Sequence, residues 1–161
     1  MNGRRLGRTL LCGAVLASTA FPAATASAAT QEFQVISITV STVAHDIGPK
    51  GASKGDTIVY RDRLVNATAQ FGKKKGVQVG SDSGTMTFTG THSATFHGKA
   101  VLPGGTLTLS GPVYTTPQGL VVPVIGGTGA FAHVHGTLLV GSGAKRVPNT
   151  YRLVRPSGPV A

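Results

Sequence analysis

The chain alternates short apolar segments with glycine- or proline-containing turns, and this pattern restricts the fold more than any other feature. Beyond about residue 30 a turn signal recurs roughly every eight to twelve residues, and no helical period is visible. A period of two predicts strands whose successive side chains face opposite sides of a sheet. The expected strands span 30–44, 56–65, 77–89, 93–102, 106–111, 121–125, 131–140 and 149–154. The sequence therefore predicts an all-β domain of eight strands, a number with which a closed barrel can hold one small ligand in its interior.

The first 28 residues have the composition of a secretory signal peptide. Three arginines precede an apolar stretch at 9–21 that is too short to span a bilayer, and Ala26-Ser27-Ala28 fits a signal peptidase site. We expect cleavage near Ala28, an extracellular location and one barrel domain over 29–161, without a transmembrane segment. The sequence leaves general and twin-arginine export both open.

Cysteine content and charge narrow the classes of partner. Cys12 is the only cysteine and lies in the leader, so the secreted domain relies on its core rather than on disulfides. The formal charge of +10 falls to +7 without the leader arginines, and Lys73, Lys74 and Lys75 are adjacent. A basic secreted protein can adhere to an anionic cell-wall surface. Nucleic-acid binding also calls for interleaved aromatic residues, which are few here, so no nucleic-acid partner is expected.

The segment VVPVIGGTGAFAHVHGTLLV at 121–140 contains two predicted strands around a cluster of glycines. A phosphate-binding glycine loop needs a helix after it, and the residues that follow favour a strand, so we interpret the glycines as a β-turn. His133 and His135 then share one strand face, which is the beginning of a metal site. The segment offers no carboxylate and no third ligand, and we expect neither a metal nor another cofactor.

Asp62 is the acid that stands out in the predicted strand at 56–65. It shares a face with Tyr60 and apolar neighbours, while two arginines face the other way. Two interpretations stay open: a carboxylate paired with a nearby cation, or a cavity acid whose raised pKa suits it to proton transfer. Extending the alternation of 30–44 places Asp46 on the face of that strand that carries its isoleucines.

The string GGTGAFAHVHG at 126–136 resembles the GGTGxFxxARG signature of dirigent proteins and the GGAG segment of the related allene oxide cyclases. Other motifs agree in order along the chain: Gly55-Asp56, Arg61-Asp62-Arg63-Leu64, Val79-Gly80, Phe96-His97-Gly98 and Leu102-Pro103-Gly104-Gly105-Thr106-Leu107. The resemblance covers about Val35 to Leu153. It implies a single eight-stranded antiparallel β-barrel of the dirigent/allene oxide cyclase-like, calycin type, with a central apolar cavity.

The resemblance also implies where polar groups of the cavity lie. His45-Asp46 matches an acid-bearing pair near the end of the first strand in dirigent proteins, and Asp62 matches their second acid. Their aspartate after GGTG is Ala130 here, and the arginine of ARG is His135. These changes argue against coupling of lignin-type phenoxy radicals. The first-strand glutamate of allene oxide cyclases has no counterpart either, so allene oxide cyclisation is not supported.

Together the residues and the resemblance define a set of expected site residues. Those expected to be catalytic are Asp46, Asp62 and His135; those expected to line the cavity are Tyr60, His133, His45 and Phe131. We expect a small hydrophobic ligand whose cyclisation, isomerisation or stereoselective coupling the barrel guides. Whether the protein is a cyclase- or isomerase-like enzyme, a non-catalytic carrier or a structural cell-wall protein stays open. The resemblance permits a homo-oligomer, either a dimer or a trimer.

Overall fold

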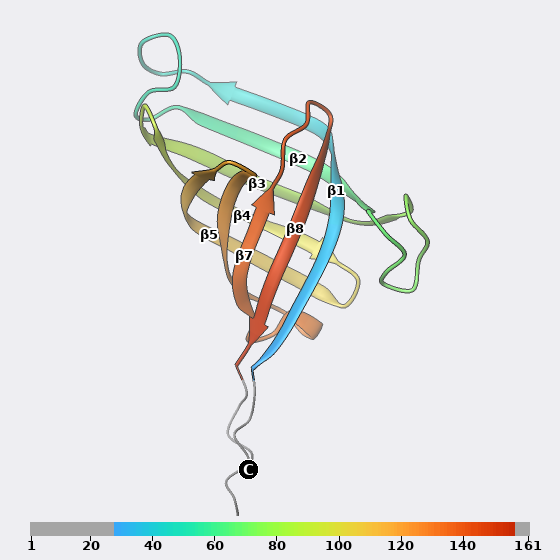
Figure 1. Ribbon diagram of the computed structural model, residues 1–161. Helices are drawn as coiled ribbons and strands as arrows, with labels where there is room; N and C mark the ends of the chain where they lie inside the picture. Colours follow the sequence, from blue (N-terminus) through green and yellow to red (C-terminus); the bar gives the residue numbers. More distant parts are fainter. Residues whose placement is uncertain (1–27, 157–161) are drawn as a thin grey trace, which may run out of the picture.

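Residues 28–156 of the computed structural model form a closed barrel of antiparallel strands (Figure 1). The strands are β1 (Ala29–His45), β2 (Thr57–Asn66), β3 (Gln78–Gly90), β4 (Ser93–Leu102), β5 (Gly105–Thr116), β6 (Gly119–Gly127), β7 (His135–Val140) and β8 (Arg146–Arg155). Each strand pairs with the next, and β8 closes on β1. The predicted fold class is therefore confirmed. Most of the leader lies outside the described residues, so the signal peptide and the domain bounds stay predictions.

β5 and β6 are longer than the sequence pattern suggested. The prediction ended one strand at 111 and left 114–119 as a loop, but the two strands continue to a tight turn in which Thr116 pairs with Gly119. Tyr114 and Thr115 have side chains that favour strands, and they pair with β6. Pro112 lies where the β5–β6 register is interrupted, so its missing N–H disturbs no regular ladder on that side.

The strand predicted to begin at Phe131 begins only at His135, so this part of the prediction is wrong. The preceding residues form a 3-10 helix, η1 (Gly129–Phe131), and His133 has a positive φ of 61°. The turn directs Phe131 into the core, with its ring centroid 6.2 Å from that of Phe33. Burial of this ring outweighs the simple alternation, and the two histidines do not share a strand face.

The glycine-rich turn packs directly against the turn between β4 and β5. A Cβ on Gly105 would lie 2.9 Å from the carbonyl carbon of Thr128, and one on Gly129 would lie 3.2 Å from the carbonyl carbon of Gly104. Gly129 also has a φ of +60°, which other residues resist. The glycines are thus required because two backbones meet here without side chains between them.

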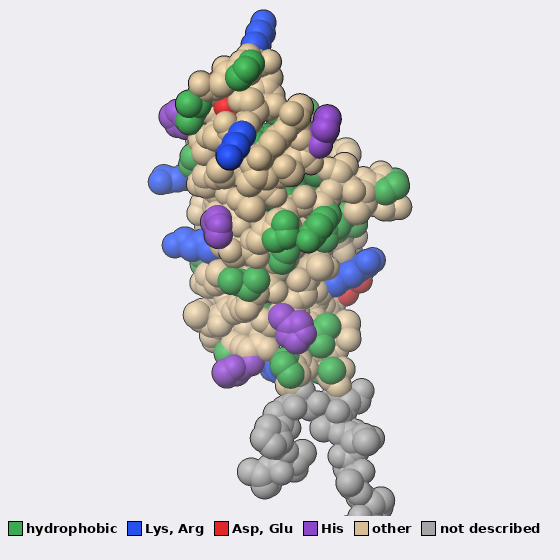
Figure 2. Space-filling model, turned by 90° about the vertical axis from the view of Figure 1, so that its left-hand side faces the viewer, with side chains coloured by type: hydrophobic (Ala, Val, Ile, Leu, Met, Phe, Trp, Pro, Cys, Tyr) green, Lys and Arg blue, Asp and Glu red, His purple; other side chains and the backbone are tan. Residues whose placement is uncertain are grey.

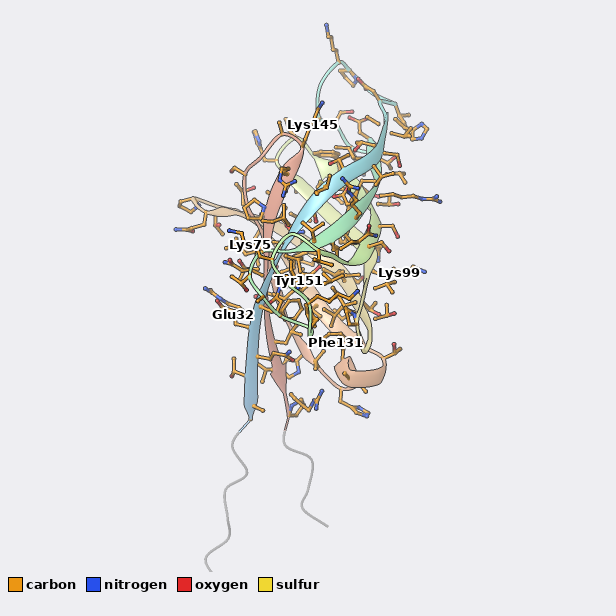
Figure 3. The ribbon with its side chains drawn as sticks, turned by 90° about the vertical axis from the view of Figure 1, so that its right-hand side faces the viewer. Glu32, Lys75, Lys99, Phe131, Lys145 and Tyr151 are labelled. Atoms are coloured by element: carbon orange, nitrogen blue, oxygen red, sulfur yellow. The ribbon has the colours of Figure 1, made fainter. Side chains whose placement is uncertain are left out.

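The barrel half nearest the chain ends is filled with side chains. Its buried residues include Phe33, Val35, Leu64, Leu102, Leu107, Leu109, Val124, Phe131, Tyr151 and Leu153. Phe33 stacks on Tyr151, with 4.9 Å between ring centroids and 16° between planes. In Figure 3, Tyr151 and Phe131 lie inside the barrel, whereas Glu32 and Lys99 lie on its outside. The larger hollows inside the barrel lie in the other half.

That other half opens between the β1–β2 loop, the short turns after β3 and β5, and the β7–β8 loop. Ala29 pairs with Arg155 at the opposite end, where the two ends of the described chain lie side by side (Figure 1). Within 28–156 we find no helix that is both long and apolar enough to cross a membrane.

Candidate functional site

The open half of the barrel contains a cavity of about 220 Å³. Its apolar walls come from most of the strands and consist of Ile58, Met86, Phe96, Leu120, Val122, Leu138, Val140 and Val147. A wider hollow of about 430 Å³ at the mouth shares Ile58, Met86 and Leu120 with it. These three side chains lie between the inner chamber and the mouth, and we call them the waist.

The inner end of the cavity is polar and lies between the apolar walls and the filled half. We call Ser37, Tyr60, Asp62, Asp82 and Asn149 the polar floor. Asp62 and Asp82 are direct cross-strand partners on β2 and β3, so their side chains point into the barrel side by side. Two carboxylates so placed repel each other when both are ionised, which favours a state in which the pair holds one proton.

Burial raises the pKa of both acids, and at Asp82 a neighbouring charge adds to the shift. Burial, followed by the charge of Asp62, raises the pKa of Asp82 to about 7, against a smaller opposing effect of the Ser37 hydroxyl. Burial also raises the pKa of Asp62, and a hydrogen bond from Thr39 opposes the shift. The pKa of Tyr60 is raised by burial and by the two acids, so Tyr60 stays a neutral hydroxyl. The floor can thus hold an exchangeable proton near neutral pH.

A chain of hydrogen bonds crosses the barrel interior to reach Asp82. Asn149 Nδ2 donates to Ser37 Oγ at 2.7 Å, and Ser37 Oγ donates to Asp82 Oδ2 at 3.4 Å. Among residues 28–156, the buried atoms Asp62 Oδ1, Asp82 Oδ1 and Asn149 Oδ1 have no hydrogen-bond partner. Buried polar atoms are normally satisfied, so the polar floor has free capacity for groups of a ligand.

The structure brings together only two of the residues expected at the site, Asp62 and Tyr60. Asp46 follows the last residue of β1, His45, and both are exposed at the rim of the mouth beside the β1–β2 loop. The inner face of β1 carries Ser37 and Thr39 and, after a register shift between Thr39 and Ser41, Thr42, so the inward face changes parity within the strand and Asp46 lies beyond its end. The expected place of Asp46 in the cavity is therefore not observed.

The other three expected residues lie at the opposite end of the barrel, near the chain ends. His133 and His135 are exposed, because Leu138 and Val140 are the β7 side chains that reach the cavity and His135 lies on the other face. Phe131 is buried in the filled half and does not line the cavity. Among the described residues, no three His, Cys, Asp or Glu side chains are grouped as metal ligands.

Sequence reasoning missed Ser37, Asp82 and Asn149. The sequence did contain a signal for Asp82, because it lies four residues before Met86 in β3 and therefore on the same strand face, and Met86 faces the cavity. The bend expected at 80–84 hid this relation. Asn149 likewise has the parity of the buried Tyr151 in β8. What the sequence could not show is that these residues, from three separate strands, meet at one level of the barrel.

The closed barrel and its polar floor place the chain among small antiparallel barrels with an internal pocket. The chain belongs to the dirigent-like protein family, whose model matches residues 21–154. The family resemblance predicted from the sequence is thereby confirmed. No curated protein matches the chain.

Solved structures share this fold at low sequence identity. A pyocyanin demethylase is 23% identical with a TM-score of 0.64, covering 76% of this chain and 99% of its own. A pterocarpan synthase dirigent protein is 16% identical with a TM-score of 0.58, covering 85% and 91%. A Diels-Alderase from Streptomyces koyangensis is 17% identical with a TM-score of 0.55, covering 84% and 72%. At these identities the likeness concerns the fold.

Proposed function

We propose that this barrel binds a small, mostly hydrophobic molecule in its cavity and guides its cyclisation or isomerisation. The observation that carries the proposal is an apolar chamber that ends in a buried carboxyl pair, Asp62 and Asp82. No Lys, Arg or His from the described part of the chain lines the chamber. An apolar pocket with a few convergent polar groups is the usual form of a small-molecule site.

The size of the cavity limits what can bind. About 220 Å³ is below the roughly 300–1,000 Å³ of typical ligand pockets, so the inner chamber holds a small molecule or one end of a longer one. The waist at Ile58, Met86 and Leu120 would let an apolar remainder extend into the mouth. A flexible molecule confined in this way has few conformers, which favours a ring closure that needs only one of them.

The carboxyl pair supplies acid–base chemistry to the confined molecule. In an isomerisation, a protonated carboxyl donates its proton to a substrate oxygen while the neighbouring carboxylate takes a proton from an adjacent carbon. The pair holds one proton before and after this exchange, so no other reactant is needed. The Diels-Alderase and the pterocarpan synthase dirigent protein, by their names, are consistent with a barrel that guides bond formation.

Native mass spectrometry of the protein from its own host tests ligand binding first. We expect a small apolar molecule to co-purify, and Leu120→Trp, which blocks the waist, to lose it. Val59→Trp on the exposed outer face is the matched control and should retain it. A wild-type protein without a passenger, which also fails to bind 2-naphthol as a neutral aromatic probe, would contradict the proposal.

The co-purified ligand also distinguishes a catalyst from a non-catalytic carrier. If the barrel is a catalyst, Asp62→Asn and Asp82→Asn abolish conversion of the co-purified molecule while keeping its binding. Asp46→Asn, at the exposed rim, leaves conversion unchanged. A ligand that stays bound and unconverted in the wild-type protein would favour the non-catalytic carrier instead.

We also infer that the protein is exported and meets an anionic wall surface. This rests on the leader sequence and on Lys73, Lys74 and Lys75 in the β2–β3 loop. On the face shown in Figure 2, Lys and Arg side chains are dispersed along the barrel rather than gathered in one patch. Amino-terminal sequencing of secreted protein, expected to begin near Ala29, tests export, and salt-sensitive retention on cell walls tests the partner.

A further inference from the structure

The two oxygens of Asp82 have different surroundings. Asp82 is only 5% exposed; its Oδ2 accepts from Ser37, whereas Oδ1 is buried without a partner among residues 28–156. The cross-strand neighbour Asp62 also has a free Oδ1. Each carboxyl group of the pair therefore has a free, buried Oδ1.

The direction of the hydrogen-bond chain follows from the chemistry of its members. Asn149 Nδ2 can only donate, so Ser37 Oγ accepts from it at 2.7 Å. Ser37 is 1% exposed, and its single O–H must be used on another acceptor, which is Asp82 Oδ2 at 3.4 Å. An oxygen that accepts this O–H is not the one that carries the acid proton. A proton on Asp82 therefore lies on Oδ1.

We propose that Asn149 and Ser37 are positioning residues that direct the proton of Asp82 to its Oδ1, and that Asp82, the more deeply buried member of the carboxyl pair, is the acid of the floor and Asp62 its base. Asn149 itself is 3% exposed, so its hydrogen bond to Ser37 lies inside the barrel. The titratable groups that face Asp82 are Asp62 and Tyr60 from β2 and Tyr151 from β8. The two tyrosines are neutral, so Asp62 is the one charged neighbour in this set.

This assignment narrows the substrate class. The floor presents one donor, Asp82 Oδ1–H, beside one acceptor, Asp62 Oδ1. A molecule that uses both carries a carbonyl oxygen next to an acidic C–H. Its carbonyl oxygen gains the proton of Asp82 as Asp62 removes the proton of the adjacent carbon, so in the substrate one C–H bond breaks and one O–H bond forms, and the proton of the pair passes from Asp82 to Asp62. The catalytic meaning rests on the proposed function, but the proton placement can be measured without a substrate.

Carboxyl ¹³C NMR titration of aspartate-labelled protein tests the assignment, with Asp62→Asn and Asp82→Asn identifying the resonances. We expect Asp82 to titrate near the value of about 7 and to be the member that holds the last proton. Ser37→Ala removes a donor to the ionised form, so the Asp82 midpoint should rise by roughly 0.5 to 1 pH unit. Ser37→Thr keeps the hydroxyl and should restore the wild-type midpoint.

Two further variants make the result specific. Asn149→Leu keeps the Ser37 hydroxyl but removes the hydrogen bond that orients it, so the titration midpoint of Asp82 should rise by a smaller amount. If Ser37→Ala fails to fold, Asn149→Leu tests the assignment in its place. Ser110→Ala is the matched control, because the Ser110 hydroxyl bonds His97 on the exposed face of the barrel, and this variant should leave the Asp82 midpoint unchanged. The assignment is overturned if folded Ser37→Ala and Asn149→Leu both titrate like the wild type, or if Asp62 holds the last proton.

The outcomes also separate this inference from the proposed function. Shifted midpoints together with a failure to bind any ligand would support the proton placement and contradict the function. Ligand binding with unshifted midpoints would contradict the placement alone.

Discussion

The ring of Phe96 packs directly against the backbone of Gly84 on the neighbouring strand. A Cβ on Gly84 would come 2.8 Å from Phe96 Cε2 and closer still to Cζ. Tyr60 stacks on the same ring at 5.8 Å between centroids, so Phe96 has no room to retreat toward β2. This glycine therefore fixes the position of an aromatic side chain in the cavity wall.

Gly84→Ala should push Phe96 out of place and lower the free energy of unfolding by about 1–3 kcal/mol, the usual cost of overpacking a core. Gly126→Ala is the matched control, because a Cβ there meets nothing within 4 Å. Urea unfolding of both variants measures the difference. Equal stability of the two would show that Phe96 can move freely.

Tyr151 has a fully buried hydroxyl with no partner in the described structure. Tyr151→Phe removes this hydroxyl and keeps the stacking on Phe33, so it should stabilise the fold by about 1 kcal/mol. Tyr151→Ala should instead cost about 3–5 kcal/mol through the cavity that it leaves. Denaturant unfolding separates the two effects, with the exposed Tyr114→Phe as a neutral control. A destabilised Tyr151→Phe would reveal a bonded hydroxyl.

Stability should depend on pH through Asp82. Its pKa in the folded protein is about 7 against an ordinary 3.8, so the folded state binds the proton more tightly between these values. The contribution of Asp82 to the free energy of unfolding is then fully present below about pH 4, decreases as the pH rises to about 7, and is lost above that. Asp82→Asn should flatten this decline and gain up to about 4 kcal/mol at pH 8. Urea unfolding at several pH values measures this dependence, with Asp46→Asn as the exposed control. If the free energy of unfolding of Asp82→Asn falls with pH as it does in the wild type, Asp82 is not the cause.

Asp56 holds the β1–β2 loop over the mouth. Its Oδ1 accepts from the backbone N–H of Ile47 at 2.9 Å and its Oδ2 from that of Ser53 at 2.7 Å. The bond from Ile47 is the main reason that the pKa of Asp56 lies below its usual 3.8. This stabilising contribution is present above pH 3.8 and is lost as the pH falls through the lowered value.

Asp56→Ala should therefore free the loop while leaving the barrel folded. We expect amide hydrogen exchange at Ile47 and Ser53 to quicken by about tenfold or more, and exchange in β7 to stay unchanged. Unchanged protection at Ile47 and Ser53 would mean that the loop is held by other contacts, such as the bond from Gly55 N to Phe88 O at 2.9 Å.

Asn66 organises the lysine-bearing loop between β2 and β3. It opens an Asn-Ala-Thr acceptor sequence, but it is only 1% exposed, and its Nδ2 donates to the carbonyls of Gln70 at 2.7 Å and Lys73 at 3.0 Å. We expect no glycan at Asn66 in a glycosylating host, as checked by intact mass. Asn66→Ala should cost about 1–3 kcal/mol, because the loop loses the hydrogen bonds from Nδ2 to the carbonyls of Gln70 and Lys73. Gln78→Ala, at an exposed site, is the control.

The alternation of residues by itself determined the all-β class and the number of strands, because each strand must bury one face, and the resemblance of the GGTG segment to dirigent proteins predicted that these strands close into a barrel. It also placed Asp62 and Tyr60 on a common inward face, since their spacing of two is local. Local patterns failed where a distant contact decided the outcome: burial of Phe131 against Phe33 turned an expected strand into η1 and left His133 and His135 outside.

The carboxyl pair was decided only by the tertiary structure. Asp62 and Asp82 become neighbours through the register of β2 against β3, and Ser37 and Asn149 reach Asp82 from two further strands. Such a meeting depends on the stagger of the strands and on register shifts within them, which the sequence of one strand does not encode. The pKa of Asp82 follows from that meeting and from burial, so the chemistry of the floor belongs to the assembled barrel.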